Sequence, residues 1–270
     1  MVGEHSHERP SCRTVVGVST LVFAGSTMAT IAWSSSMSAM GGMQMLGGWT
    51  MSMTWMRMPG RTWTGAATSF VAMWAVMMVA MMLPTLVPQL LHYRRAIGAS
   101  ETRVGLFTTL VAVGYFCVWA ACGTVVFPLG AALAGAELRL PALSRVVPLA
   151  TGLIVLLAGA LQFTTWKAHH LQAWRALPVH VRAASAGGGA AWRLGLRLGL
   201  RLGLHCLYCC AGPTAVLLAL GVMNLRTMAM VAAAVAAERL APAREKVARV
   251  VGALGVAAGV FLISRAAGIV

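Results

Sequence analysis

MWAVMMVAMMLPTLVPQLL, the segment from Met73 to Leu91, contains no charged side chain in 19 residues. A helix needs about 20 apolar residues to cross about 30 Å of hydrocarbon. The segment therefore predicts a membrane-spanning helix, which we place at Ser69–Leu91. Apolar runs of similar length recur along the chain, so this segment indicates the class of the whole fold.

The composition of the 270-residue chain agrees with a lipid environment. Hydrophobic residues make up 59% and charged residues only 10%, and the mean hydropathy is +0.79, whereas an ordinary soluble domain is about 25% charged. Only helices and closed barrels satisfy their backbone polar groups in lipid, and long runs without two-residue alternation are not typical of a barrel. The sequence predicts an all-α, polytopic membrane helix bundle.

We expect about six to seven transmembrane helices in a single domain, 14–270, that follows a cytoplasmic N-terminal tail, 1–13. This domain is expected to include a Met-rich outer loop, 34–66, and a basic cytoplasmic loop, 167–201. The sixth candidate span is short, and it is expected to lie partly buried against its neighbours. The candidate spans are Val15–Trp33, Ser69–Leu91, Leu106–Phe127, Val146–Trp166, Leu204–Gly221, Thr227–Leu240 and Ala248–Ser264.

The formal net charge of +15 would suggest a nucleic-acid partner in a soluble protein. With the N-terminus in the cytoplasm, most Lys and Arg residues, Lys167 and Arg239 among them, fall on the cytoplasmic side, as the positive-inside rule requires. We therefore predict a bacterial cytoplasmic (inner) membrane protein with the lipid bilayer as a partner and no nucleic acid. The first apolar segment could be a cleaved signal peptide, but its apolar core exceeds the usual length of roughly 7–15 residues, which favours a retained helix.

The loop between Ser34 and Gly65 is rich in methionine, glycine, serine and tryptophan. Such a loop has no core of its own in which to bury thioethers, and thioethers are soft ligands that select Cu(I), so the loop could collect that ion. The alternative is an interfacial segment, with Trp49, Trp55 and Trp63 at headgroup level and methionines as adaptable filler. Its methionines are Met37, Met40, Met43, Met45, Met51, Met53, Met56 and Met58.

Methionine recurs in the second candidate span. Met73, Met77 and Met81 form one stripe at four-residue spacing, and Met78 and Met82 form a second stripe beside it. Two prolines, at positions 84 and 88, remove backbone donors, which should kink the helix. The stripes are explained either as metal ligands or as ordinary helix packing.

The run RLGLRLGLRLGL, from Arg193 to Leu204, leads into the fifth candidate span. As a strand it would alternate, but its frequent glycine argues against that. As a helix it carries three arginines on one face and three glycines on nearly the opposite face. We predict that the glycines allow close helix contact and that the arginines reach the cytoplasmic headgroups.

The stretch HCLYCC, from His205 to Cys210, places three thiols and an imidazole within six residues. Cys206 is one helical turn from both Cys209 and Cys210. Counting 1.5 Å per residue from the predicted helix entries puts Cys210 about 12 Å from the cytoplasmic side and Met81 about 18 Å from the outer side, which is the same depth in a core about 30 Å thick. The predicted metal ligands are Cys206, Cys209, Cys210, His205, Met77, Met81 and Met82.

The pairing of MWAVMMVAMMLPTLVP with GLHCLYCCAGPTAVLLALGVMNLRTMAM and AAERLAP resembles a bacterial family of predicted metal-binding, multi-pass integral membrane proteins. The resemblance runs from roughly Phe70 to Leu240, and it implies a membrane fold that binds metal. Tyr208 and Thr227 depart from the family's pattern, but neither departure removes a sulfur. The positions that match the pattern are Met77, Met81, Met82, Pro84, Cys206, Cys209, Cys210, Met223, Asn224 and Glu238.

The remaining reactive side chains have simpler explanations. Cys117 and Cys122 are spaced too far around one helix to share an ion and are expected to act as small hydrophobes. Cys12 is expected in the reducing cytoplasm, and the 169–170 histidine pair in a solvated loop. Glu238 ends an apolar segment, and it either pairs with Arg239 or Arg244 at the membrane boundary or has a proton-coupled role.

Two hypotheses for function follow from these residues. The first is an inner-membrane protein that binds, delivers or transports a soft metal such as Cu(I) through Met and Cys sulfurs, with a metal-delivering or metal-accepting protein as a partner. The second is a membrane thiol-disulfide oxidoreductase that uses the Cys206/Cys209 pair. The abundant methionines favour the metal hypothesis, and no motif for hydrolytic or nucleotide-driven catalysis is visible in the sequence.

Overall fold

The computed structural model describes residues 8–39, 41–45, 49–56, 60, 62–97, 101–169 and 189–269. The predicted N-terminal tail, Met-rich loop and basic loop fall partly outside these residues. Met40, Met58 and His170 also lie outside them.

The described chain is almost entirely helical, which confirms the predicted all-α bundle. A small antiparallel hairpin, with Met43 opposite Met51, follows the first helix. A short helical segment at 165–169 comes before the cysteine-bearing helix. In chain order the elements are α1 (Glu8–Ala39), β1 (Gly42–Gln44), β2 (Thr50–Ser52), η1 (Met53–Trp55), α2 (Trp63–Ile97), α3 (Glu101–Arg139), α4 (Pro141–Leu161), α6 (Gly189–Cys209), α7 (Ala211–Leu220), α8 (Leu225–Leu240) and α9 (Arg244–Ala266).

Five described helices, α1, α2, α3, α4 and α9, are long and apolar enough to cross a membrane. A sixth crossing results if α6 and α7, which meet at an angle of 62°, form one broken span. The described residues therefore contain five or six candidate spans, and six lies within the expected six to seven. The predicted span Leu204–Gly221 is divided between α6 and α7, because the helix breaks at Cys210.

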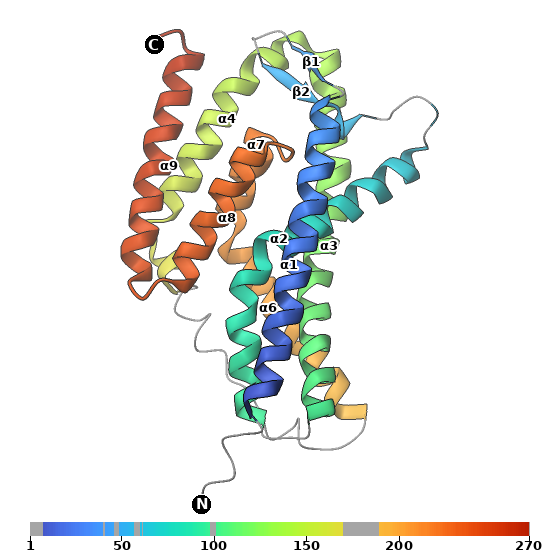
Figure 1. The fold of residues 1–270 in the computed structure, drawn as a ribbon. Coiled ribbons are helices and arrows are strands. Elements are labelled where there is room, and N and C mark those ends of the chain that lie inside the picture. Colours follow the sequence, from blue (N-terminus) through green and yellow to red (C-terminus); the bar gives the residue numbers. More distant parts are fainter. Residues whose placement is uncertain are drawn as a thin grey trace, which may run out of the picture.

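The helices form two groups that lie side by side (Figure 1). In one group α3 packs against α6 and α2, and α1 packs on α2; in the other, α4 packs against α9 and α7. Contacts of α8 with α2, α7 and α9 join the groups. The hairpin lies at the end of the bundle opposite the start of α1, and α8 and α9 meet near the lower edge of their group (Figure 1).

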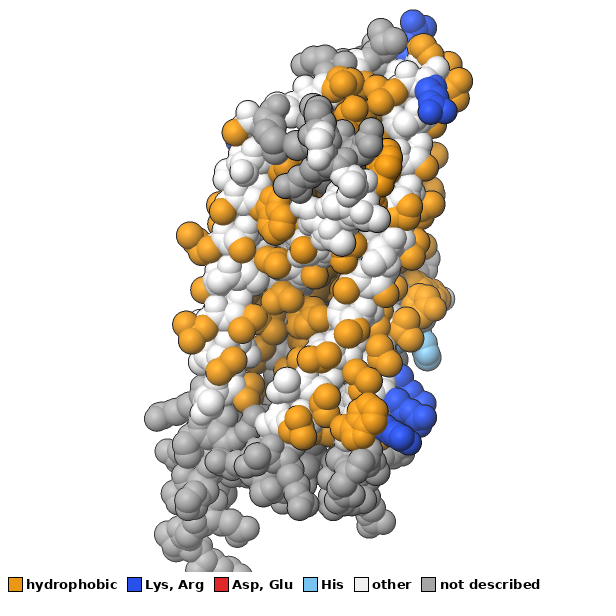
Figure 2. Space-filling model, turned by 90° about the vertical axis from the view of Figure 1, so that its right-hand side faces the viewer, with side chains coloured by type: hydrophobic (Ala, Val, Ile, Leu, Met, Phe, Trp, Pro, Cys, Tyr) orange, Lys and Arg blue, Asp and Glu red, His pale blue; other side chains and the backbone are white. Residues whose placement is uncertain are grey.

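The exterior of the bundle is largely hydrophobic. Figure 2 shows one face on which hydrophobic side chains predominate and on which Lys and Arg side chains lie near the upper and lower ends. Large side chains such as Leu21, Leu129 and Leu254 are more than half exposed. Exposed apolar surface of this extent is the expected exterior of a bundle that packs against lipid.

The glycines of the RLGL run pack α6 tightly against α3, as predicted. A Cβ atom added at Gly199 would lie 2.3 Å from the carbonyl oxygen of Val111, and one added at Gly114 would lie 2.7 Å from the carbonyl oxygen of Leu196. Gly195 and Gly203 meet the same helix. The arginines of the run lie on the exposed side of α6. Backbone-to-backbone approach is therefore what sets the position of α6.

We expect Gly199→Ala to lower the free energy of unfolding by about 1–3 kcal/mol, because the new methyl group meets backbone atoms that cannot rotate away. Denaturant unfolding in detergent micelles measures this change. Gly25→Ala is the matched control, since no atom lies within 4 Å of a Cβ at that helical position and alanine favours helix. Equal losses in both variants would contradict the packing role of Gly199.

Candidate functional site

The three cysteines of HCLYCC lie where α6 ends and α7 begins. Cys206 and Cys209 belong to the last turn of α6, and Cys210 precedes α7. Their exposed fractions are 0%, 3% and 2%, respectively, so none of these thiols meets solvent. All three are free thiols.

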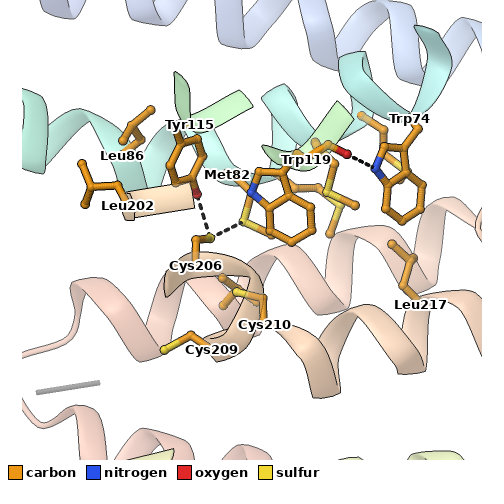
Figure 3. Close-up of a cluster of buried hydrophobic side chains, with 14 of the residues drawn as sticks. Trp74, Met82, Leu86, Tyr115, Trp119, Leu202, Cys206, Cys209, Cys210 and Leu217 are labelled. Carbon is orange, nitrogen blue, oxygen red and sulfur yellow. Dashed lines mark hydrogen bonds between the residues drawn. The ribbon is translucent and has the colours of Figure 1, made fainter. Parts of the chain in front are cut away.

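Cys206 on α6 contacts α2, and these are the two helices whose sulfur atoms were predicted to meet. Its Sγ atom lies 4.0 Å from the Sδ atom of Met82 on α2, and it accepts a hydrogen bond of 2.8 Å from the hydroxyl of Tyr115 on α3 (Figure 3). Cys210 lies one helical turn further on, and its backbone N–H bonds to the Cys206 carbonyl at 2.9 Å. Two thiols and one thioether from separate helices therefore lie together in the core.

The methionines of α2 are all buried, but they do not contribute equally to this cluster. Met82 is 1% exposed and contacts Cys206. Met77 and Met81, the other predicted ligands on α2, are 1% and 5% exposed and lie in the same hydrophobic core. Met78 lies one turn before Met82 and is 1% exposed. Met82, from the Met78/Met82 stripe, is thus the methionine that contacts a thiol.

The other predicted ligands, His205 and Cys209, have different surroundings. His205 is half-buried on α6. The electrostatic neighbours of Cys209 include Arg239, Lys167 and Glu238. Cys209 is therefore close to charged side chains, and Cys206 contacts Met82 and Tyr115.

A buried charged network borders the thiols. The Arg239 Nη2 atom donates a hydrogen bond of 3.1 Å to Cys210 Sγ. The Lys167 Nζ atom lies 2.8 Å from Glu238 Oε2, and Gln162 Nε2 donates to Glu238 Oε1 at 2.8 Å. Each of these four polar side chains is at most 7% exposed. Buried charges of this kind are retained where they are paired and hydrogen-bonded.

The network corrects one expectation drawn from the sequence. Lys167 and Arg239, which were assigned to the cytoplasmic side, are buried. Glu238 was expected to pair with Arg239 or Arg244, yet its partner is Lys167. The reason is the convergence of chain segments that are distant in sequence: the segment after α4 and the end of α8 both meet the break between α6 and α7.

Pro213 explains why Lys167 reaches this break. An uninterrupted helix would bond the backbone N–H of residue 213 to the carbonyl of Cys209, but proline has no N–H to donate. The Lys167 Nζ atom instead donates a hydrogen bond of 2.9 Å to the Cys209 carbonyl oxygen. The Lys167 ammonium group thus hydrogen-bonds the carbonyl that the helix break leaves without a donor, and it also pairs with the Glu238 carboxylate.

The sequence interpretation did not identify Tyr115, Lys167 or Arg239 as neighbours of the thiols. Lys167 directly follows the apolar run Val146–Trp166, and this position could have indicated a buried charge. Arg239 lies in the ERL sequence at the end of an apolar helix, which could have indicated the same. Nothing in the local sequence distinguishes Tyr115 from an ordinary core tyrosine.

The donor set of the cluster restricts the ion that it can hold. Within the described residues, no group of three or more His, Cys, Asp or Glu side chains is arranged to hold a metal ion. The thioether of Met82 is a further soft donor beside Cys206. Thiolate and thioether donors suit Cu(I) among the available metals.

The fold and this cluster define the chain as an apolar helical bundle with a buried centre of soft sulfur donors. The model of the PpoB2 family, described as copper chaperone, matches residues 71–262. The match covers most of the chain, and the protein belongs to this copper chaperone family. The copper-related part of the predicted function is thereby confirmed. No curated protein and no solved structure shows significant similarity to the chain.

Breaking the buried ion pair should destabilise the bundle. We expect Glu238→Gln to cost about 3–5 kcal/mol, because it leaves the Lys167 ammonium buried without its carboxylate. Denaturant unfolding in detergent measures the loss. The double variant Lys167→Met/Glu238→Gln should recover part of it, since neither charge remains. The single variants Glu238→Gln and Lys167→Met give the two separate losses in the free energy of unfolding. If the double variant loses the sum of these two values, the pair does not act as a unit.

Proposed function

We propose that the protein is a multi-pass inner-membrane copper chaperone that holds Cu(I) between α6 and α2. Cys206, Cys210 and Met82 are the proposed ligands. The contact of 4.0 Å between the sulfurs of Cys206 and Met82 is the observation that carries this proposal, because it brings a thiol and a thioether from different helices to one point. Met77, Met81, Cys209 and His205 stay predicted ligands.

The chemistry of the donors supports Cu(I) as the cargo. Cu(I) is a soft ion, and thiolates and thioethers are soft ligands. Thiols bind metal as thiolates, so loading releases protons. Cys206 and Met82 belong to separate helices, α6 and α2. A small relative movement of these helices would open the site and release the ion to a partner protein.

Charge balance gives Arg239 a role in the loaded state. Cu(I) held by two thiolates carries a net charge of −1. The Arg239 guanidinium, already hydrogen-bonded to Cys210, supplies +1. The Lys167–Glu238 pair adds no net charge, so the loaded centre is neutral, and a neutral centre avoids most of the cost of burying a charge.

Placement in a membrane is supported by the apolar helices and the hydrophobic exterior. The proposed topology has the N-terminus in the cytoplasm, in keeping with the positive-inside rule. The thiol centre then lies inside the bilayer, away from water and from competing ligands. We infer that the chaperone exchanges Cu(I) with a metal-delivering or metal-accepting protein rather than with free solution.

Substitution of the proposed ligands tests the site. We expect Cys206→Ser and Cys210→Ser to weaken Cu(I) binding by more than the roughly 10–100-fold that changes around a metal site cost, because each removes a ligand itself. Met82→Leu should preserve the fold at a packing cost under about 1.5 kcal/mol and still weaken binding. An anaerobic titration against a chromophoric Cu(I) chelator measures the affinities.

Cys117→Ser is the control for these variants, since Cys117 is an exposed thiol, and it should bind Cu(I) like the parent protein. The oxidoreductase hypothesis makes a different prediction: Cys209→Ser would be as damaging as Cys206→Ser, and a Cys206–Cys209 disulfide would cycle with a quinone pool. Parental Cu(I) affinity in the Cys206→Ser and Met82→Leu variants would overturn the proposed site.

The charge-balance argument predicts a graded effect at position 239. Arg239→Gln should weaken Cu(I) binding by about 10–100-fold, a loss typical of groups that support metal ligands, whereas Arg239→Lys keeps the positive charge and should retain most of the affinity. The same chelator titration measures both variants. Equal losses in the Gln and Lys variants would mean that the shape of the guanidinium, rather than its charge, matters at Cys210.

A further inference from the structure

The β1–β2 hairpin gathers thioethers on one of its faces. Met43 lies directly opposite Met51, and the side chains of such a cross-strand pair leave from the same face with Cβ atoms about 4.5–5.5 Å apart. Met45 is two residues beyond Met43, and side chains two residues apart also share a face. Its backbone N–H bonds to the carbonyl of Trp49 at 2.9 Å, which extends the pairing.

The hairpin is held against the helices rather than extending freely from them. The Trp49 indole N–H donates a hydrogen bond of 2.9 Å to the carbonyl of Ser144 on α4. The Trp55 ring, just after β2, contacts Phe70 at 5.2 Å between ring centroids and fills the space that a Cβ at Gly130 would need. The three thioethers are therefore positioned in advance by the fold.

The three methionines differ in the exposed fraction of their side chains, and the order of exposure suits capture of an ion. Met51 is 2% exposed, Met45 is half-buried, and Met43 is 37% exposed. This order corrects the expectation that the methionines of this loop cannot be buried, because Met51 is almost fully buried. An ion arriving from solution can meet Met43 first and then gain the other two sulfurs.

The sequence of the hairpin excludes harder donors. Residues 41–56 contain no Cys, His, Asp or Glu and no Lys or Arg. Thioethers are the only strong soft ligands in this segment, and they select Cu(I) over divalent ions such as Zn²⁺. A site made only of neutral thioethers should also bind less tightly than one that contains thiolates.

We propose that Met43, Met45 and Met51 form a second Cu(I) site, distinct from the thiol centre, at the end of the bundle opposite the start of α1 (Figure 1). The site lies before residue 71, where the match to the copper chaperone family begins. It rests on the proposed function in that both sites serve Cu(I). It acts as a weaker capture site on the outer side of the bundle.

The number of Cu(I) ions bound per chain tests this proposal. Under anaerobic dialysis against a weak Cu(I) chelator, the parent protein should hold two equivalents, and Met43→Leu/Met45→Leu should hold one. Met230→Leu is the matched control, because Met230 is 62% exposed on α8, away from the hairpin, and it should still hold two. Met43→Leu alone, at an exposed position, should weaken the second equivalent without affecting the fold.

The thiol variant separates this proposal from the function proposed above. Cys206→Ser/Cys210→Ser should lose the tight equivalent and retain the weaker one, and X-ray absorption should report only sulfur around the remaining ion. If that variant kept both equivalents while the hairpin variant lost one, the thiol centre would be wrong and the hairpin site supported. If Met43→Leu/Met45→Leu and Met43→Leu bind like Met230→Leu, the hairpin site is overturned.

Discussion

The close contact between α3 and α6 is the constraint on which the thiol centre depends. Glycines on both helices let backbone meet backbone, as at Gly199 and Val111. Cys206 follows one turn after the last glycine of this contact, and the short interhelical distance places its sulfur against Tyr115 of α3 and Met82 of α2. A larger side chain in the α6 glycine row would move the thiol away from both partners.

A second constraint acts from the opposite side of the same cysteines. Pro213, in the first turn of α7, has no N–H to donate to the Cys209 carbonyl, and α6 and α7 meet there at an angle of 62°. Lys167 supplies that hydrogen bond, Glu238 neutralises Lys167, and Arg239 contacts Cys210. Breaking a helix in an apolar bundle leaves backbone groups without partners, and the charged side chains near the break supply the missing hydrogen bond. The same side chains can balance the negative charge of a metal–thiolate centre.

Much of this arrangement could be predicted from sequence because it depends on local patterns. Apolar runs located the helices, the RLGL repeat indicated a glycine contact, and counting residues from the helix ends put Met81 and Cys210 at the same depth. The charged network could not be predicted, because no local pattern tells that the segment at Lys167 and the end of α8 converge on Cys210. The hairpin was missed for a similar reason: three-residue strands are too short to show alternation, and Trp49 and Trp55 dock by contacts distant in sequence.

The most direct test of the shared Cys–Met centre is copper X-ray absorption on selenomethionine-labelled protein loaded with one equivalent of Cu(I). The tightest site should then contain both sulfur from Cys206 and Cys210 and selenium from position 82, and the selenium signal should vanish in labelled Met82→Leu. A first shell of sulfur alone in the labelled parent, or one of nitrogen and oxygen, would contradict the account.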